Sequence, residues 1–237
     1  MQETAVQETA VQETPVPGTT ITVEGRFEHH HAAERGTVSL VVGFEGPQRE
    51  DVVQRATHAH ARIVDQVRAL HDPSSGPVTW WSAQRMSVWS RRPWNDHGKQ
   101  LPFVHHAQVG LEAKFSDLAR LAEWVEQVAV LDGVTVRGVD WTLTEVTRTR
   151  LVADARARAV ADAVERAGAY ASALGLTDVR AVALAEPGML GDQSRPAAPE
   201  AVAMMRGAVA DASGGQLDLK PEDITVESAV HARFVAS

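Results

Sequence analysis

The sequence predicts an α+β fold in which helices pack on one side of a mixed or antiparallel sheet. Three patterns lead to this prediction. Apolar residues alternate with polar ones over segments of strand length, as half-buried strands require. Other segments carry apolar residues every three or four positions, which is the spacing of one helix face. A long segment in the C-terminal half carries alanine at every fourth position, which allows a helix to approach its neighbour closely.

The first two strands are expected within residues 20–44. Ile21 and Val23 alternate with polar neighbours, and the alternation resumes at Val38 after the turn-like residues 32–36. Two alternating segments separated by a short polar turn predict a β-hairpin.

Two strand-strand-helix units then account for the first half of the domain. An amphipathic helix is expected over residues 49–71 and another over 118–131, the second with Ser116–Asp117 as its N-cap. Strands are expected over 78–91 and 103–115. Each unit also carries a histidine run, a weak internal repeat that suggests duplication.

The second half is dominated by a long helix, expected over residues 149–174 and ended by Gly175. Its repeating alanines are Ala155, Ala159, Ala163, Ala167 and Ala171. The remaining elements are a strand over 134–146 before the helix, a strand over 179–185, a variable insert at about 187–221 and a final strand over 224–235.

The N-terminal segment is a five-residue repeat, QETAV-QETAV-QETPV, over residues 2–16. It buries too little apolar surface to offset the entropy lost on ordering. Residues 1–19 are therefore expected to form a disordered or extended acidic tail, and residues 20–237 the domain. An edge strand within an assembly is the alternative, because valine recurs at a fixed period.

Charge and composition narrow the classes of function. The 237-residue chain carries a net charge of −8, which argues against a nucleic-acid binder. It has no cysteine, which excludes disulfides, thiolate metal sites and cysteine nucleophiles. Residues 1–18 lack the features of a signal peptide, and no stretch is long and apolar enough for a membrane helix. We expect a cytoplasmic protein without membrane insertion, or a periplasmic one for a processed mature form.

Four segments carry a family resemblance when taken in order: ITVEGRFEHHHAAERGTVSLVVGFEG, GVTVRGVDWTLTE, ARARAVADAVERAGAYASALGL with DVRAVALAEPG, and PEDITVESAVHARF. Together they span residues 20–234, and they resemble the SIMPL domain family (DUF541). The resemblance implies helices on one side of a sheet, ring- or channel-like homo-oligomers and a link to stress response. It implies no catalytic residues. Unlike many bacterial members, this sequence shows no signal peptide, and its middle segment is rich in tryptophan and histidine.

Signatures of catalysis are missing from the sequence. It contains no G-x-S-x-G elbow, H-E-x-x-H, P-loop, G-x-G-x-x-G or EF-hand loop. We therefore expect no enzymatic activity and no cofactor, with a hydrolase-like enzyme whose site has no sequence signature as the third-ranked alternative.

Histidine supplies the first candidate site. In a strand, His29 and His31 would share one face, and His105 or His106 from a neighbouring strand would complete a three-nitrogen zinc, nickel or copper site. A histidine-rich surface strand explains the same pattern without a metal and is favoured. Clustered histidines also predict a pH-sensitive assembly as a further alternative.

Tryptophan supplies the second candidate site. Trp80 and Trp81 are adjacent on a predicted strand and so face opposite ways, and Trp89 is expected to share the face of Trp81. Arg85 and Arg91 are interleaved with these rings. Tryptophan and arginine are enriched at protein interfaces, although packing of the rings in the core is an equally good interpretation. Stacking on single-stranded nucleic acid is disfavoured by the acidic charge.

These observations predict a non-enzymatic, self-assembling scaffold or partner-binding protein, related to stress response by resemblance. A homo-oligomer is the expected state, and a second protein partner the other interpretation. The alternative function is histidine-based metal binding.

Overall fold

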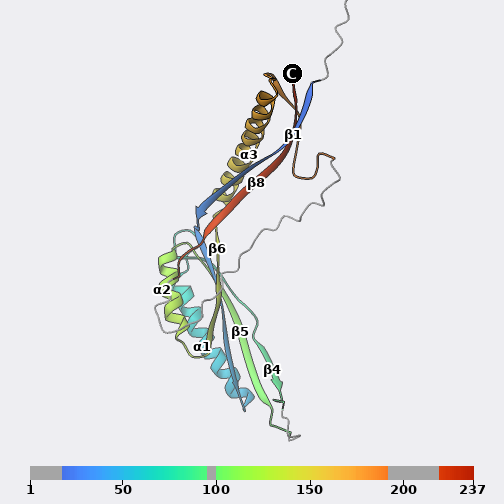
Figure 1. Cartoon of the computed structure of the whole chain (residues 1–237). Helices are drawn as coiled ribbons and strands as arrows, with labels where there is room; N and C mark the ends of the chain where they lie inside the picture. The colour runs from blue at the N-terminus through green and yellow to red at the C-terminus, as the bar shows by residue number, and fades with distance from the viewer. Residues whose placement is uncertain (1–17, 95–99, 192–218) are drawn as a thin grey trace, which may run out of the picture. The chain divides into compact units, whose positions relative to one another are not determined.

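The structure is a computed structural model that describes residues 18–94, 100–191 and 219–237. Its elements are β1 (Thr19–Ala32), β2 (Arg35–Gly46), α1 (Arg49–Leu70), β3 (Val78–Ala83), β4 (Ser87–Arg91), β5 (Val104–Phe115), α2 (Leu118–Ala129), β6 (Val134–Thr142), α3 (Glu145–Ala173), β7 (Val179–Ala185) and β8 (Asp223–Ala236). The predicted α+β class is confirmed, with antiparallel sheets (Figure 1). None of the helices in the described part is long and apolar enough to cross a membrane.

The described residues fall into two compact units. Residues 18–28, 152–191 and 227–237 form one, which we call the α3 unit. Residues 29–94, 100–151 and 219–226 form the other, which we call the α1–α2 unit.

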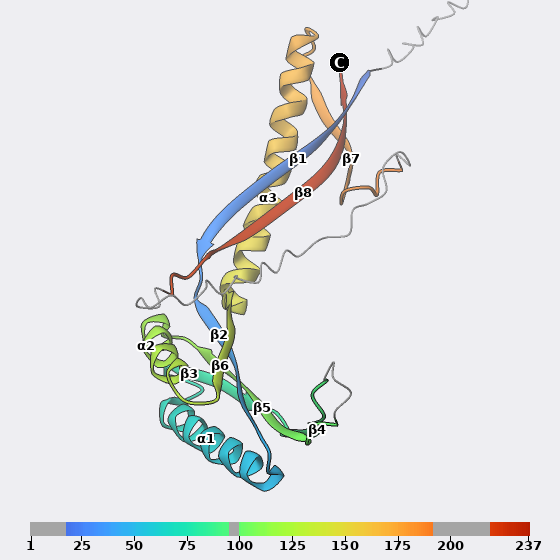
Figure 2. The same ribbon diagram turned by 60° about the horizontal axis from the view of Figure 1, so that its bottom comes forward.

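In the α3 unit, a long helix packs on a three-stranded sheet of order β1-β8-β7 (Figure 2). The predicted alanine stripe is confirmed as the contact surface, because Ala159, Ala163, Ala167 and Ala171 are fully buried. They pack against apolar residues of the sheet, among them Ile21, Val23, Val230 and Phe234. Side chains this small let the helix backbone approach the sheet closely. At Gly25, an added Cβ would lie 2.0 Å from the carbonyl oxygen of Ala159.

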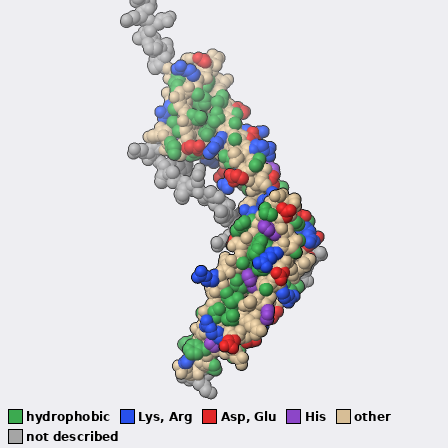
Figure 3. Space-filling model, turned by 180° about the vertical axis from the view of Figure 1, so that it is seen from behind, with side chains coloured by type: hydrophobic (Ala, Val, Ile, Leu, Met, Phe, Trp, Pro, Cys, Tyr) green, Lys and Arg blue, Asp and Glu red, His purple; other side chains and the backbone are tan. Residues whose placement is uncertain are grey.

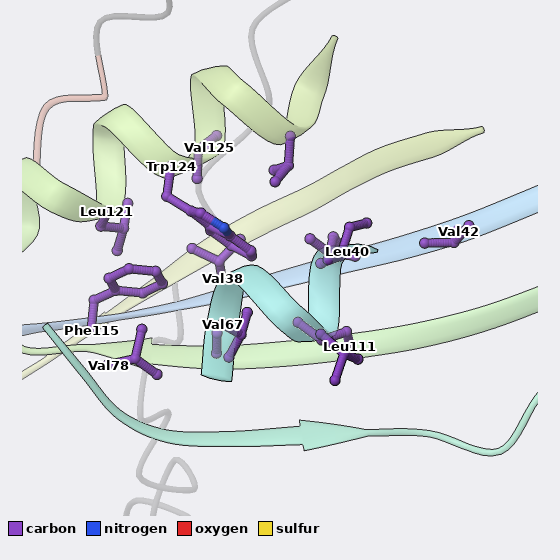
Figure 4. Packing of buried hydrophobic residues seen from close by; sticks show 14 of the residues in the cluster. Val38, Leu40, Val42, Val67, Val78, Leu111, Phe115, Leu121, Trp124 and Val125 are labelled. Atoms are coloured by element: carbon purple, nitrogen blue, oxygen red, sulfur yellow. The ribbon is translucent and has the colours of Figure 1, made fainter. Parts of the chain in front are cut away.

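In the α1–α2 unit, the second sheet has the order β3-β5-β2-β6, and β4 also pairs with β5. Both helices pack on the same face of this sheet (Figures 1 and 2). Val38 and Leu40 of β2, Phe115 of β5, and Leu121 and Trp124 of α2 meet in the core between these layers (Figure 4). Phe115 is fully buried, and its ring centroid lies 5.4 Å from that of Trp124.

The predicted β1–β2 hairpin is wrong. β1 pairs with β8 in one sheet, whereas β2 pairs with β5 and β6 in the other. The apolar face of β1 packs on the alanines of α3, and that of β2 packs on α1 and α2. Alternation reveals that a strand has one buried face, but it does not specify which layer covers that face.

Element boundaries show which local signals were reliable. Asp117 caps α2 as predicted, because its carboxylate accepts hydrogen bonds from the amides of Ala119 and Arg120 at 3.0 and 3.1 Å. The expected strand over residues 78–91 is divided into β3 and β4. Helix α3 begins at Glu145, earlier than expected, because a glutamate from the β1–β2 connection stabilises its first turn.

That glutamate is Glu34. One carboxylate oxygen accepts hydrogen bonds from the hydroxyl and the amide of Thr144, both at 2.7 Å, and the other from the hydroxyl of Thr147 at 2.8 Å. Together these bonds, led by the Thr144 hydroxyl, lower the pKa of Glu34 to about 2. The ionised carboxylate also complements the positive end of the helix dipole.

Glu34→Gln is expected to lower the free energy of unfolding of the α1–α2 unit by about 1–2 kcal/mol at pH 7. Because the folded pKa is below the ordinary value, the contribution is complete above about pH 4.5 and is lost as the pH falls toward about 2. The difference between the variant and the wild type should therefore shrink over that range in urea titrations. Glu222→Gln, at an exposed residue, is the control and should cause no change. An equal difference at pH 7 and pH 2.5 would contradict this role.

Candidate functional site

The candidate site lies on the face of the five-stranded sheet opposite α1 and α2. Alternation along β2 and β5 directs Val38, Leu40, Leu111 and Phe115 toward the helices. The residues between them point to the other face, which neither α1 nor α2 covers. Two large aromatic side chains are exposed there: Trp80 is 46% exposed and Trp89 is 41% exposed. We call this surface the open face.

The strand pairing decides which tryptophans reach the open face. Trp80 pairs with Lys114 on the open face, whereas Trp81 pairs with Ala113 and packs against the core. Trp89 pairs with His106, also on the open face. The expectation that Trp89 shares a face with Trp81 is therefore wrong.

An extra residue between β3 and β4 causes this difference. Ala83 pairs with Leu111 and Ser87 with Gln108, so four steps along β3–β4 match three along β5. An extra residue in one strand reverses the alternation of every side chain beyond it. Gln84 lies in this break, where its backbone N–H donates a hydrogen bond to the carbonyl oxygen of Gly110 at 2.9 Å. The absence of a side chain at Gly110 leaves space for that of Gln84, since a Cβ there would lie 2.5 Å from the Gln84 Oε1.

A cross-strand row on the open face joins the two groups of residues that the sequence singled out. Trp89 of β4, His106 of β5 and Glu45 of β2 are successive pairing partners. The Trp89 and His106 rings stack with centroids 5.2 Å apart and planes 7° apart. On its other side, the His106 Nδ1 lies 3.4 Å from the Glu45 carboxylate.

His106 is buried under Trp89, with 7% of its surface exposed. Its Nε2 has no hydrogen-bond partner among the described residues. A shallow groove of about 300 Å³ adjoins the row, and its lining residues are Gly43, Phe44, Glu45, Trp89, His106, Ala107 and Gln108. A flat aromatic surface beside an exposed carboxylate suits protein contact, because it offers apolar area together with a polar group that sets orientation.

The other predicted histidines lie elsewhere. His105 faces away from His106, and its Nδ1 lies 2.6 Å from the Ser90 hydroxyl. His29 and His31 lie on β1 with ring centroids 6.2 Å apart, in a different sheet from His105 and His106. The structure thus does not bring the four candidate metal ligands together. Across residues 18–94, 100–191 and 219–237, no three histidine or carboxylate side chains are placed to hold a metal ion.

The Ser90–His105 pair has two members of a nucleophile–base arrangement. A third group that orients the base is normally required. Within the described residues, no carboxylate contacts His105. The pair therefore gives no geometric support to catalysis.

The predicted arginines flank the aromatic residues. Arg85 lies in the break between β3 and β4, and Arg91 ends β4. Both are exposed. Beyond β4, the guanidinium of Arg92 lies 4.2 Å from the centre of the Phe103 ring.

Charges on the open face nearly balance, although the chain carries −8. By alternation from the paired strands, the charged residues of this face are Arg35, Arg91 and Lys114, against Glu45, Glu112 and Asp140. In the view of Figure 3, side chains of both signs are interspersed with hydrophobic ones on the molecular surface. A nearly neutral face does not repel another acidic protein, or another copy of this one.

Sequence reasoning missed Glu45 and His60. Glu45 continues the alternation of β2, which was the available signal, but its contact with His106 required the strand order. His60 lies on α1, where burial lowers its pKa and its Nε2 has no partner among the described residues.

Comparisons with known proteins place these features in context. A family model described as "SIMPL: Protein of unknown function (DUF541)" matches residues 21–234. No curated protein sequence matches the chain. A solved structure, described as the X-ray crystal structure of a putative amidohydrolase/peptidase from Burkholderia cenocepacia, is similar with 16% identity and a TM-score of 0.25. The similarity covers 68% of this chain and 36% of that one, so this chain matches about a third of that protein's length.

Proposed function

The chain belongs to the SIMPL family (DUF541), whose function is unknown, and from this premise we propose that it is a non-enzymatic protein that self-assembles through the open face. The observation that carries the proposal is the exposure of Trp80 and Trp89 on that one face, 46% and 41% respectively. Each leaves roughly 100 Å² of aromatic surface in water. Covering that area contributes roughly 2.5 kcal/mol per side chain.

A second copy of this chain fits the open face better than an oppositely charged partner. The face carries nearly equal numbers of basic and acidic side chains, so a strongly basic protein would gain little there. Glu112 and Lys114 are two residues apart on β5 and point the same way. In a two-fold symmetric contact, Lys114 of one copy would face Glu112 of the other, which makes the surface self-complementary. Homo-oligomers are also what the family resemblance implies.

We do not propose metal binding as a second function. The histidines on β1 and those on β5 lie in different sheets, so the alternative has no geometric support.

Replacing both exposed rings, as Trp80→Ser with Trp89→Ser, is expected to weaken self-association by at least about 10-fold, because buried tryptophans dominate interface energies. Light scattering of the full chain over a range of concentrations measures the change. Wild-type protein should form a discrete oligomer. The double variant should be monomeric at protein concentrations at which the wild type is still assembled.

Trp94→Ser is the matched control. Trp94 is 84% exposed and lies beyond the end of β4, so its loss should leave the oligomer intact. A monomeric wild type would overturn the proposal. So would a double variant that keeps the wild-type mass, because that result would place the contact on another surface.

A further inference from the structure

A second cleft of the α1–α2 unit lies away from the open face and has a different chemistry. It has a volume of about 230 Å³ and lies where α1 meets the end of β2 and the turn between α2 and β6. Its lining residues are Phe44, Arg55, His58, Ala59, Arg62, Leu131 and Asp132. Neither the family match nor the proposed assembly assigns a role to it.

Basic side chains dominate the polar part of this cleft. Arg55, His58 and Arg62 come from one face of α1, at positions i, i+3 and i+7. At 1.5 Å rise per residue, they line about 10 Å of the helix. Asp132 is the single acidic residue among the described residues that line the cleft. The cleft is therefore locally cationic in a chain whose net charge is −8.

Arg55 is held in place before any ligand arrives. Its Nη2 lies 3.3 Å from the Asp132 carboxylate, and its guanidinium carbon lies 4.4 Å from the centre of the Phe44 ring. The ion pair is exposed and so adds little stability. Together, however, the carboxylate and the ring restrict the orientation of the guanidinium, which reduces the entropy lost on binding.

Arg62 is the second guanidinium of the cleft. It is exposed, and no carboxylate in the described part of the chain pairs with it. A guanidinium presents a planar fork of donors that matches phosphate and carboxylate oxygens. With Arg55 oriented and Arg62 unpaired, an oxyanion can meet two guanidinium groups and the His58 imidazole.

The remainder of the lining is apolar. Phe44, Ala59 and Leu131 provide a surface for a small hydrophobic group. The volume is below the roughly 300–1,000 Å³ of clefts that bury drug-sized ligands. This space suits one charged group with a ring or short chain attached.

We infer that this cleft binds a small organic phosphate, with the phosphate between Arg55 and Arg62 and the apolar part against Phe44 and Leu131. The affinity is modest because the arginines are exposed, with a dissociation constant on the order of 1 mM. The inference is separate from the proposed assembly, since Arg55, His58 and Arg62 lie on α1, outside the open face, and Phe44 is the one residue that this cleft shares with the groove beside Trp89.

The test uses the full chain and phenyl phosphate, followed by NMR of backbone amides. Saturable shifts should centre on residues 55–62 of α1 and on the 131–133 turn. Inorganic phosphate should bind several-fold more weakly, because it lacks the apolar part, and phenol should not bind measurably. Arg62→Gln should weaken phenyl phosphate binding about 10-fold. Arg62 is exposed and pairs with no carboxylate among the described residues, so this variant should fold normally.

Arg49→Gln is the matched control, because Arg49 lies on the same helix, is exposed and does not line the cleft. It should bind phenyl phosphate as the wild type does. If both variants bound phenyl phosphate equally weakly, the effect would come from the overall charge of the helix and not from this cleft, and the inference would be overturned. Chemical shift changes centred on another surface would overturn the inference as well. So would a failure to saturate at phenyl phosphate concentrations up to about ten times the expected dissociation constant.

Discussion

Gly25→Ala is expected to destabilise the α3 unit by about 3 kcal/mol, because no side chain fits between β1 and α3 at this position. A Cβ on residue 25 would lie 2.0 Å from the carbonyl oxygen of Ala159 and 2.7 Å from the amide nitrogen of Ala163. Both are backbone atoms, so no side-chain rotation can relieve the clash. The helix must move away from the sheet, which opens gaps along the alanine stripe.

Hydrogen exchange of α3 amides is the suitable measurement, because all six tryptophans lie in the α1–α2 unit and do not report on this one. Gly168→Ala is the control. Gly168 lies on the same helix with nothing within 4 Å of an added Cβ, so alanine should stabilise the helix by about 0.5–1 kcal/mol. Unchanged exchange in Gly25→Ala would show that the helix does not lie this close to β1.

Phe115→Ala is expected to destabilise the α1–α2 unit by about 4 kcal/mol, which lies within the range of about 3–5 kcal/mol for truncation of a buried phenylalanine. Phe115 is fully buried at the end of β5. It contacts both layers, since β2 and β3 pair with its strand and the Trp124 ring of α2 lies 5.4 Å away (Figure 4). The neighbouring side chains come from rigid elements and cannot collapse into the space left behind.

Urea unfolding followed by tryptophan fluorescence measures this change, since Trp124 is itself a neighbour of the altered site. Phe103→Ala is the matched control. It removes the same side chain from a position that is 48% exposed, and should cost less than about 1 kcal/mol. If both variants lost equal stability, Phe115 would not be the core residue that its burial indicates.

The positions of the elements could be read from the sequence because the signals are local. Alternation located β2 and β5, the N-cap residue Asp117 located the start of α2, and Gly175 located the end of α3. The alanine period also predicted the close helix packing. Each of these signals depends on residues within one or two turns of each other, so no knowledge of distant segments was needed.

Strand partners could not be read in the same way. β1 pairs with β8, whose residues lie some two hundred positions further along the chain, instead of with the adjacent β2. The Glu34 carboxylate likewise stabilises a helix that begins at Glu145. Nothing near Glu34 in the sequence distinguishes it from other surface glutamates.

The candidate site likewise has features that the sequence predicted and features that required the tertiary structure. The sequence alone determined that tryptophan and histidine are concentrated in the segments that became β3, β4 and β5, and that arginines lie among them. The tertiary structure alone decided that Trp80 and Trp89 share the open face and that His106 lies between Trp89 and Glu45. The physical reason is strand register: one extra residue between β3 and β4 reverses which side chains face the core, and only pairing with β5 reveals it.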